Sequence, residues 1–561
     1  MKKLSAAIVA ILLGSTAAAA DFRVTRFDDP APNGCTALDC SVREAVIAAN
    51  AAAGADRVVL RTGTYSLTRV DTTPDTYQVD LGPLWVTSAI SFVGAGEGAT
   101  LLRWNTGIGH PGTHANRVIY AFLATSNPGV VEISSMTISH GRGAQGGCVR
   151  MEGIGSTLRL NRAVLQSCYS PSGGGALYVH NAALNLDQVT VRSNGAYHGG
   201  AMQIIGTVSV TSRNTLITNN TADYNAGAVY IYGNALAGLL TTVNWVDNGG
   251  TVIENNVAAG AGGAIQVKDT AHLNLSSAST VAPADWLVLR ANIAGGVGGA
   301  IHNAPPLGPN NYSVIQRVRL LENQASDGGA IATSSAMTLV DAEIAGNRAE
   351  TGVGGGIAFM GTLDWAPGRS LARVSLRANY AATGGGGIHS SCLPFTAENV
   401  SLHLNDAGGP GRGQAIETEG SATLRHLTLY SNTSSANPGA PGLYKRYTTA
   451  CPDTSVRVAN SLIGDYCAAP NGGLFSDGGN QLGPFAINCP ALQTIDQRQS
   501  TNTVFKLGFG AYGGPFVLVG WTADLQTRPQ RNFGLASYCT SIDARGIARA
   551  DGLCDAGAFE Q

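Results

Sequence analysis

The residues best suited to chemistry follow one repeated motif of two glycines, a small residue and an apolar residue, as in "GGAI" at 262–265. Directly after the apolar position, six successive copies carry Arg150, Tyr178, Gln203, Tyr230, Gln266 and His302. Two positions further on stand Glu152, His180, Tyr232 and Lys268. Flat rings beside amides and charged groups suit a saccharide, because rings stack on its C–H faces and polar groups bond to its hydroxyls.

The same residues could also support a reaction on an acidic polysaccharide. A uronate needs a cation to offset its carboxylate, for which Arg150 or Lys268 is available. It also needs a base to remove the adjacent proton, and the candidates for that base are Tyr178, His180, Tyr230 and His302. The alternatives are therefore a glycan-binding face formed by Tyr178, Gln203, Tyr230, Tyr232, Gln266 and His302, a catalytic groove, or an ordinary polar sheet surface.

A second marker recurs upstream of the glycines and indicates how these residues are positioned. Nine asparagines each stand three residues after an aliphatic one, at intervals of 24 to 36 residues: Asn194, Asn220, Asn256, Asn292, Asn323, Asn347, Asn379, Asn405 and Asn432. Alternating stretches such as "MTLVDAEI" between them predict short strands. A 24-residue interval is too short for a propeller blade of about 40 residues, and sandwich domains do not repeat one signature.

These observations predict an all-β, right-handed single-stranded parallel β-helix, in which each coil buries its apolar face against its neighbours. Each asparagine is expected to take a left-handed backbone at one corner and to bond to the asparagine of the next coil. The glycines are expected to form the second corner, where φ becomes positive. The polar residues after the motif then line up on a flat outer face, unless the register is shifted by one residue.

The N-terminus predicts export, and the sequence as a whole divides into four segments. Lys2 and Lys3, the apolar run 6–13 and the alanines 18–20 predict a signal peptide over 1–20. We expect an N-terminal cap and first coil over 21–67, including a helix within 41–54 in which Arg43 and Glu44 pair. The β-helix repeats follow over 68–446, and a C-terminal cap or anchor-like module over 447–561. The protein is expected to be secreted or on the cell surface, or in the periplasm, and no later stretch predicts a membrane span.

Composition narrows the partners. The net charge is −2 and only 13% of residues are charged, which gives no basic surface for nucleic acid. No motif for a metal or a cofactor stands out, and the oligomeric state is open. The ten cysteines fit disulfides in an exported protein. Spacing does not fix their connectivity, but pairing of neighbours suggests Cys35–Cys40, Cys148–Cys168, Cys467–Cys489 and Cys539–Cys554, which leaves Cys392–Cys451.

Both ends resemble one family. The segment from Cys35 to Leu67 resembles the N-terminal segment of exported bacterial right-handed β-helix proteins that carry a C-S-L-R-E-A motif, with Val42 in place of Leu. The stretches "YGGP" at 512–515, "SIDARG" at 541–546 and "CDAGAFE" at 554–560 are similar to the choice-of-anchor module that ends those proteins. The repeats are also similar to those of polymorphic outer-membrane adhesins, although an aliphatic residue replaces their usual Phe.

The resemblance implies a pectin-lyase-like fold on an exported protein, and it implies no reaction, because that fold carries enzymes and adhesins alike. The sequence therefore leaves three hypotheses. The first is a non-enzymatic adhesin or envelope protein that binds an extracellular polysaccharide or a cell-surface glycan. The second is a polysaccharide lyase or glycoside hydrolase with a groove running from Arg150 to His302. The third is a purely structural rod.

Overall fold

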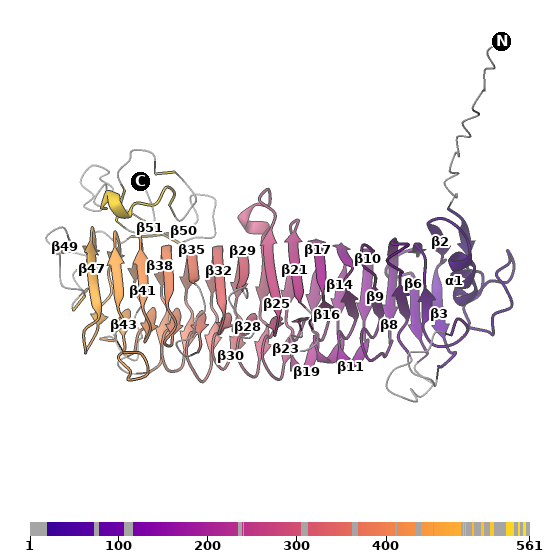
Figure 1. Ribbon diagram of the computed structural model, residues 1–561, viewed down its shortest axis with the longest axis horizontal. Coiled ribbons are helices and arrows are strands. Elements are labelled where there is room, and N and C mark those ends of the chain that lie inside the picture. Colours follow the sequence, from indigo (N-terminus) through magenta and orange to yellow (C-terminus); the bar gives the residue numbers. More distant parts are fainter. Residues whose placement is uncertain are drawn as a thin grey trace, which may run out of the picture.

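The computed structural model describes residues 19–561 except 72–77, 106–115, 234–237, 239, 305–311, 362–367, 410–411, 433–438, 453 and much of 484–561. From 484 onward the described residues are 486, 488–489, 496–498, 506–509, 517–520, 534–543, 548–549 and 554–556. The predicted signal peptide lies almost entirely outside the described residues. Figure 1 shows a long stack of coils with the N-terminal helix at one end.

Three parallel sheets form the walls of this stack, which confirms the predicted parallel β-helix. We call the 14-stranded sheet sheet B and the 9-stranded sheet sheet C. Sheet B consists of β4 (Leu84–Val86), β7 (Ile119–Phe122), β9 (Val149–Glu152), β12 (Leu177–His180), β16 (Met202–Ile205), β20 (Val229–Tyr232), β24 (Ile265–Lys268), β28 (Ile301–Ala304), β31 (Ile331–Thr333), β34 (Ile357–Phe359), β37 (Ile388–Ser390), β40 (Ile416–Thr418), β43 (Leu443–Lys445) and β46 (Cys467–Ala468). Sheet C consists of β11 (Tyr169–Gly173), β15 (Gly195–His198), β19 (Thr221–Asn225), β23 (Val257–Ala258), β27 (Ile293–Ala294), β30 (Gln324–Ala325), β33 (Arg348–Ala349), β36 (Tyr380–Ala381) and β39 (Asp406–Ala407).

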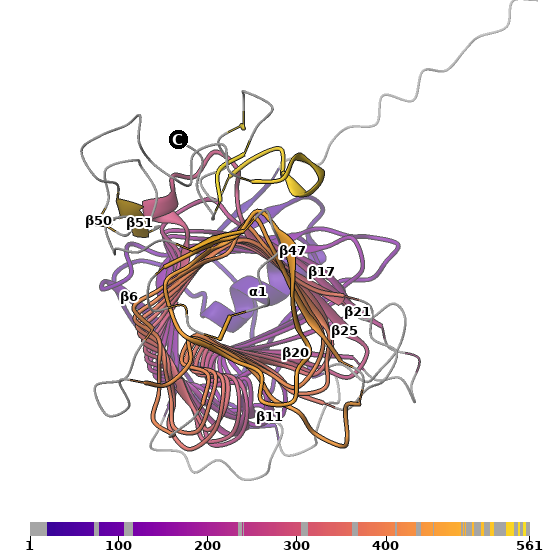
Figure 2. The ribbon, with the colours of Figure 1, turned by 90° about the vertical axis from the view of Figure 1, so that its left-hand side faces the viewer.

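The 26-stranded sheet, sheet A, closes each coil. Its strands are β1 (Asp21–Arg23), β2 (Asp56–Val59), β3 (Gly63–Leu67), β5 (Ile90–Val93), β6 (Thr100–Trp104), β8 (Val130–Ser139), β10 (Thr157–Gln166), β13 (Ala183–Asp187), β14 (Thr190–Arg192), β17 (Thr207–Arg213), β18 (Leu216–Thr218), β21 (Thr241–Asp247), β22 (Val252–Glu254), β25 (Ala271–Ser277), β26 (Leu287–Arg290), β29 (Tyr312–Leu321), β32 (Ala336–Ala345), β35 (Arg369–Arg377), β38 (Phe395–His403), β41 (Ala422–Arg425), β42 (Thr428–Tyr430), β44 (Val456–Ala459), β45 (Leu462–Ile463), β47 (Leu474–Gly478), β48 (Gln481–Leu482) and β49 (Gln497–Arg498). A typical coil passes through sheet C, then sheet B, then sheet A, and Figure 2 shows the coils end on as nested rings around one core.

The asparagine ladder is confirmed for all nine positions. Each side-chain amide donates to the side-chain oxygen of the asparagine in the next coil; Asn256 Nδ2 lies 3.0 Å from Asn292 Oδ1, for example. The ladder ends on Asp465, which accepts from Asn432 Nδ2 at 2.7 Å. Burial raises the pKa of Asp465 to about 6, against the opposing hydrogen bonds from Asn432. The ladder therefore runs through most of the stack.

The left-handed residue at this corner is not the asparagine that we expected. The positive φ belongs to the residue just before it, at 54° for Asn219, 51° for Ala291 and 56° for Glu322. The asparagine side chain turns inward to bond along the stack, so the preceding residue makes the turn.

The glycine corner is confirmed, and each glycine of the pair has its own reason. The first has a positive φ, 73° at Gly262 and 72° at Gly298. At the second, a Cβ would overlap the backbone of the next coil: on Gly263 it would meet the carbonyl oxygen of Gly299. Turn geometry fixes the first position and close stacking of the coils fixes the second.

Helix α1 (Val42–Ala51) packs beside β1, β2 and β4 at the N-terminal end (Figure 1). Ser41 caps it, because its backbone N–H donates to Glu44 Oε2 at 2.7 Å and its hydroxyl accepts from Glu44 N. The expected Arg43–Glu44 pair is wrong. Arg43 instead forms a buried ion pair with Asp29 at 2.7 Å, since side chains adjacent in a helix do not face each other. The residues of the C-S-L-R-E-A-like motif thus stabilise the N-terminal cap.

The stack continues past the predicted boundary at 446. Sheet B adds β46 after β43, and sheet A adds β44, β45, β47, β48 and β49. The sequence signature is lost there because Asp465 replaces the ladder asparagine and no glycine pair stands between it and β46. The boundary of the repeats therefore lies later than expected.

Described residues of the C-terminal region pack on the flank of the last coils, above β38 and β41 in Figure 1. Asn399 Nδ2 donates to the carbonyl of Ile542 at 3.0 Å, and Asn460 Nδ2 donates to that of Leu535 at 3.0 Å. These residues therefore lie beside the last coils, and not across the end of the stack, where a cap would lie. Much of the region, including "YGGP", lies outside the described residues.

The five suggested disulfides all form: Cys35–Cys40, Cys148–Cys168, Cys392–Cys451, Cys467–Cys489 and Cys539–Cys554. The third pair joins residues 59 apart in sequence. Five disulfides are typical of a protein folded in an oxidising, exported environment.

Candidate functional site

The residues that follow the glycine motif form one column along sheet B, as their spacing predicts. We call this the outer column. In strand register it runs through Trp85, Tyr120, Arg150, Tyr178, Gln203, Tyr230, Gln266, His302, Ala332, Ala358, His389, Glu417 and Tyr444. The flanking residues, such as Leu177 and Val179, belong to the hydrophobic core, so the column points away from that core.

Pointing outward does not leave the column open to solvent. Tyr178 and Tyr230 are each only 4% exposed, and Gln266 is 2% exposed. Sheet C provides the cover at the glycine corner: the ring of His198 on β15 stacks on Tyr230 with centroids 4.5 Å apart. A Cβ on Gly173 would likewise overlap the side chain of Gln203. The expectation of an open wall at these positions is therefore wrong.

Five rings in mutual contact cross from sheet C to sheet B, and we call Tyr197, His198, Tyr224, Tyr230 and Tyr232 the aromatic cluster. Tyr197 and Tyr224 stack with centroids 5.6 Å apart, and His198 lies 4.7 Å from Tyr197. Tyr230 and Tyr232 stack at 5.7 Å. The partly buried ring of His198 and the buried ring of Tyr230 thus support the outer ones.

The exposed part of the aromatic cluster lies on sheet C. Tyr197 is 45% exposed and Tyr224 is 50% exposed. The sequence reasoning missed both, because it followed only the strands after the glycines. The alternation in "GAYH" and "ADYN", just before the glycine corner, is the signal that could have revealed them.

The second row of predicted residues is partly exposed and borders the aromatic cluster. Tyr232 and Lys268 are register neighbours on adjacent coils, and His180 lies further along the same sheet. Burial lowers the pKa of His198, and the charge of Lys268 lowers it further. The same two causes, in the same order, lower the pKa of His302 to about 4. His302 is therefore neutral at neutral pH, and its Nδ1 lies 3.0 Å from Gln266 Nε2.

Arg150 belongs to a separate group nearer the N-terminus. Its guanidinium lies 4.8 Å from the ring centre of Tyr120 and 5.1 Å from that of Tyr178, and it is ion-paired with Glu152. Burial raises the pKa of Tyr178 to about 12, although Arg150 opposes the shift. Burial also raises the pKa of Tyr230. Both phenols are therefore protonated at neutral pH, the form in which a phenol can donate a hydrogen bond.

The column becomes charged again near its C-terminal end. His389 and Glu417 are register neighbours on β37 and β40. They are 5% and 0% exposed. Arg412 Nη1 lies 3.1 Å and Arg446 Nη1 lies 3.9 Å from the same oxygen, Glu417 Oε1. Sequence spacing could not predict this group, because both arginines lie outside the repeated motif.

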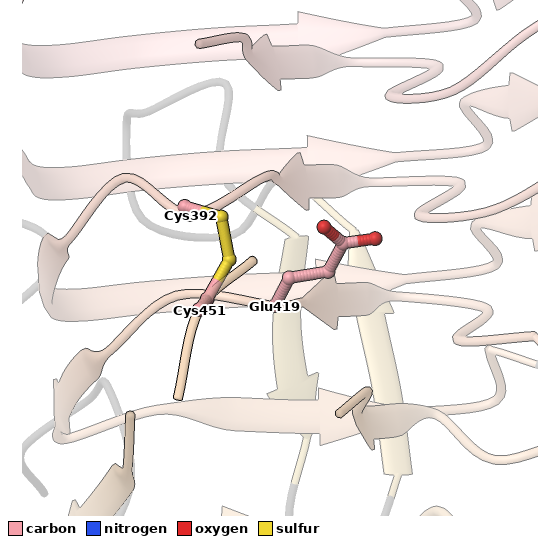
Figure 3. Close-up of side chains that lie close together, drawn as sticks. All are labelled: Cys392, Glu419 and Cys451. Atoms are coloured by element: carbon pink, nitrogen blue, oxygen red, sulfur yellow. A yellow bond between two sulfur atoms is a disulfide. The ribbon is translucent and has the colours of Figure 1, made fainter. Parts of the chain in front are cut away.

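Among the described residues, one group of three His, Cys, Asp or Glu side chains brings its potential metal-ligand atoms together. Cys392, Glu419 and Cys451 bring their sulfur and carboxylate atoms within 4.8 Å of one another. Figure 3 shows the two sulfur atoms bonded to each other beside the Glu419 carboxylate. Neither sulfur is a thiolate in this state, so the group does not offer the ligands of a thiolate metal site.

Comparisons with known proteins agree with the repeat. Residues 250–268 match the model of the Chlamydia polymorphic membrane protein repeat, and this segment contains Asn256 and the motif at 262–265. No curated protein matches the sequence significantly. A solved structure, the catalytic domain of a GH87 alpha-1,3-glucanase D1069A variant in complex with tetrasaccharides, aligns with 12% identity and a TM-score of 0.35. That alignment covers 76% of this chain and 68% of the glucanase chain. Within the described residues, no helix is long and apolar enough to cross a membrane.

Proposed function

We propose that this protein is an exported surface protein of the adhesin or envelope type, which binds extracellular glycan at the aromatic cluster and Lys268. The observation that carries the proposal is the continuous contact of five rings, of which Tyr197 and Tyr224 are about half exposed. Exposed rings held in place by buried ones lose little freedom when a sugar stacks on them. The resemblance of the repeat to adhesin repeats supports the class of protein.

The predicted glycan-binding residues take two roles in this proposal. Tyr232 and Lys268 are partly exposed and would contact the saccharide directly. Tyr178, Gln203, Tyr230, Gln266 and His302 would form the layer beneath, which fixes the outer rings. The lysine would bond to hydroxyls and would favour acidic sugars over neutral ones.

The protonation states of three of the four predicted bases favour binding over catalysis. The predicted bases Tyr178 and Tyr230 have raised pKa values and remain phenols at neutral pH. His302 has the opposite shift, and with a pKa of about 4 it is a weak base with little proton affinity. Arg150 is engaged by Glu152 and two rings. A lyase or hydrolase is the alternative hypothesis, and the assay described below is designed to detect it.

A glycan array followed by calorimetry on the best ligand tests the proposal. We expect Tyr197→Ala combined with Tyr224→Ala to weaken binding at least about tenfold, because each ring contributes on the order of 1 kcal/mol. Tyr312→Ala is the matched control, since Tyr312 is 54% exposed on sheet A, and it should change nothing. Undiminished binding by the double variant at an unchanged melting temperature would remove the aromatic cluster from consideration.

The same preparation tests the enzymatic alternative. Acidic and neutral polysaccharides are incubated with the protein, and unsaturated uronate products and new reducing ends are measured. We expect neither to accumulate. Turnover that is lost in His302→Gln or Arg150→Gln would replace the binding proposal by an enzymatic one.

A further inference from the structure

The His389–Glu417 pair occupies the outer column well away from the aromatic cluster. Both side chains are at least nine-tenths buried, yet both are polar. Nδ1 of His389 has no hydrogen-bond partner among the described residues. Burying such groups costs free energy unless something else in the site uses them. A purely structural column would carry small residues here, as it does at Ala332 and Ala358.

Two arginines reach the same carboxylate from the surface side. Arg412 Nη1 and Arg446 Nη1 both approach Glu417 Oε1, at 3.1 and 3.9 Å, while the backbone N–H of Gly413 donates to Oε2 at 3.1 Å. The Arg412 and Arg446 side chains are 34% and 40% exposed. Each guanidinium has five N–H donors, so most remain free for a ligand in the solvent. The two cations thus converge at the surface, over a buried acid.

The charge of this group depends on one proton. Glu417 faces neutral His389 from the preceding coil, Tyr444 from the next coil, and the arginines; Glu419 lies two residues along and pairs with Arg446 at 3.2 Å. Burial raises the pKa of Glu417, against the pull of Gly413 N–H and Arg412. Burial and the nearby arginines lower the pKa of His389 to about 4, so its charge does not change near neutral pH. With Glu417 ionised, the four charged side chains sum to zero; with it protonated, they sum to +1.

We propose that Arg412 and Arg446 form an oxyanion-binding site, for the carboxylate or sulfate group of an anionic ligand, and that Glu417 takes up a proton when the ligand binds. The ligand and the Glu417 carboxylate compete for the same two positive charges and repel each other. Protonation of Glu417 removes both conflicts. The site is independent of the glycan-binding proposal, because it shares no residue with the aromatic cluster.

Linkage gives the sign of the pH dependence. A bound anion near Glu417 favours its neutral form, so it raises the pKa of that carboxyl further. By reciprocity, protonation of Glu417 strengthens anion binding by the same factor. Affinity therefore increases as pH falls, and it stops increasing once Glu417 is protonated in the free protein.

Calorimetry of the full mature chain tests the proposal with three probes: trigalacturonate, inorganic sulfate and neutral maltotriose. We expect trigalacturonate to bind about tenfold tighter at about pH 5.5 than at about pH 8, with net proton uptake measured by changing the buffer. Arg412→Gln and Arg446→Gln should each abolish most of this binding. Arg348→Gln is the matched control, because Arg348 is a 45% exposed arginine paired with Glu350 on sheet C.

Glu417→Gln provides the sharpest variant, because the amide mimics the protonated acid. It should bind trigalacturonate tightly at both pH values, with no proton uptake. Sulfate binding that also needs both arginines supports the site and identifies it as indifferent to the sugar ring. Equal affinity for maltotriose, unchanged binding in folded Arg412→Gln, or a pH dependence that persists in Glu417→Gln would each overturn the proposal. Loss of the aromatic cluster leaves all these results unchanged, so the two proposals fail separately.

Discussion

The aromatic cluster and the Arg412–Arg446 site share the outer column of sheet B, but different segments of the chain cover the column at the two sites. Tyr230 and Glu417 lie six strands apart in register, which corresponds to about 30 Å. The same ladder and the same glycine corner support both. At the first site, sheet C covers the column with rings; at the second, loop residues supply two cations. The backbone therefore sets position, and the covering segment sets the chemistry.

The largest effect should come from the ladder that the two regions share. In Asn292→Leu, the backbone N–H and Nδ2 of Asn256 lose their common acceptor, and both are buried. The N–H of Asn256 is left unpaired, and the bonds from Asn292 Nδ2 to the carbonyl of Ile253 and to Asn323 are lost. Together these losses should destabilise the fold by about 3 kcal/mol. Thermal and denaturant unfolding measure the loss, and affinity at both sites should fall together.

The control for this change is Asn244→Leu, which replaces an exposed asparagine on sheet A. It should shift stability by less than about 0.5 kcal/mol. Equal destabilisation by the two variants would contradict the role of the ladder.

The next effect is a pH dependence that both regions should show. Burial holds the pKa values of His302 and His389 at about 4, below the value near 6.5 in an unfolded chain. The neutral histidines stabilise the fold fully above about pH 6.5, and this contribution is lost as pH falls towards about 4. Each should account for on the order of 2 kcal/mol.

Unfolding measured across this pH range checks the prediction, and His302→Gln and His389→Gln should each flatten the slope. Asp465 works in the opposite direction, because its raised pKa favours the folded state at low pH. Each variant is therefore compared with the unaltered protein at every pH. A slope that survives both substitutions would mean that other groups cause it.

A smaller effect should separate the two regions. Tyr224→Ala removes one half-exposed ring and should weaken binding of the array-identified glycan about fivefold. Trigalacturonate binding at Arg412 and Arg446 should not change, because no contact joins the two groups. Calorimetry with both ligands on the same preparation gives the comparison, and parallel losses would indicate a single extended site.

The smallest effect concerns Lys268. In Lys268→Gln we expect about a twofold loss of affinity for an acidic glycan, as is usual for an exposed charge. The substitution should also raise the pKa of His198 and His302, because the lysine lowers both. Histidine titration by NMR measures those shifts, and no upward movement would contradict the inferred proximity.

Much of the fold could be predicted from the sequence, because the repeated residues are those that the backbone requires at the corners of each coil. The asparagines and glycines at fixed positions indicated two corners, and these set the register of the outer column from Arg150 onward. Neighbouring cysteines also gave the correct pairs. The left-handed residue was predicted one position too late. The Asn side chain turns inward to form the ladder, so the residue before it takes the positive φ, and the sequence pattern does not show this.

The site was less predictable, for a physical reason. Register determines on which side of a strand Tyr178 and Tyr230 leave the backbone, but not what lies over them. That cover comes from His198 on the neighbouring sheet, and its closeness depends on the angle of the glycine corner. Arg412 and Arg446 come from segments between repeats, where no periodic signal exists.

The glycine pair also has a consequence for how this molecule can change in length. A backbone with no room for one extra carbon at Gly263 or Gly299 cannot accept inserted residues at that corner. Growth or shortening of the rod is therefore confined to whole coils, in steps of about 4.8 Å. Removing the coil that carries Ala332 would bring the two proposed binding regions closer by one such step, with each left intact. The distance between the two regions is therefore set by the number of coils between them, and the affinity of a bivalent ligand of fixed length would report a change in that number.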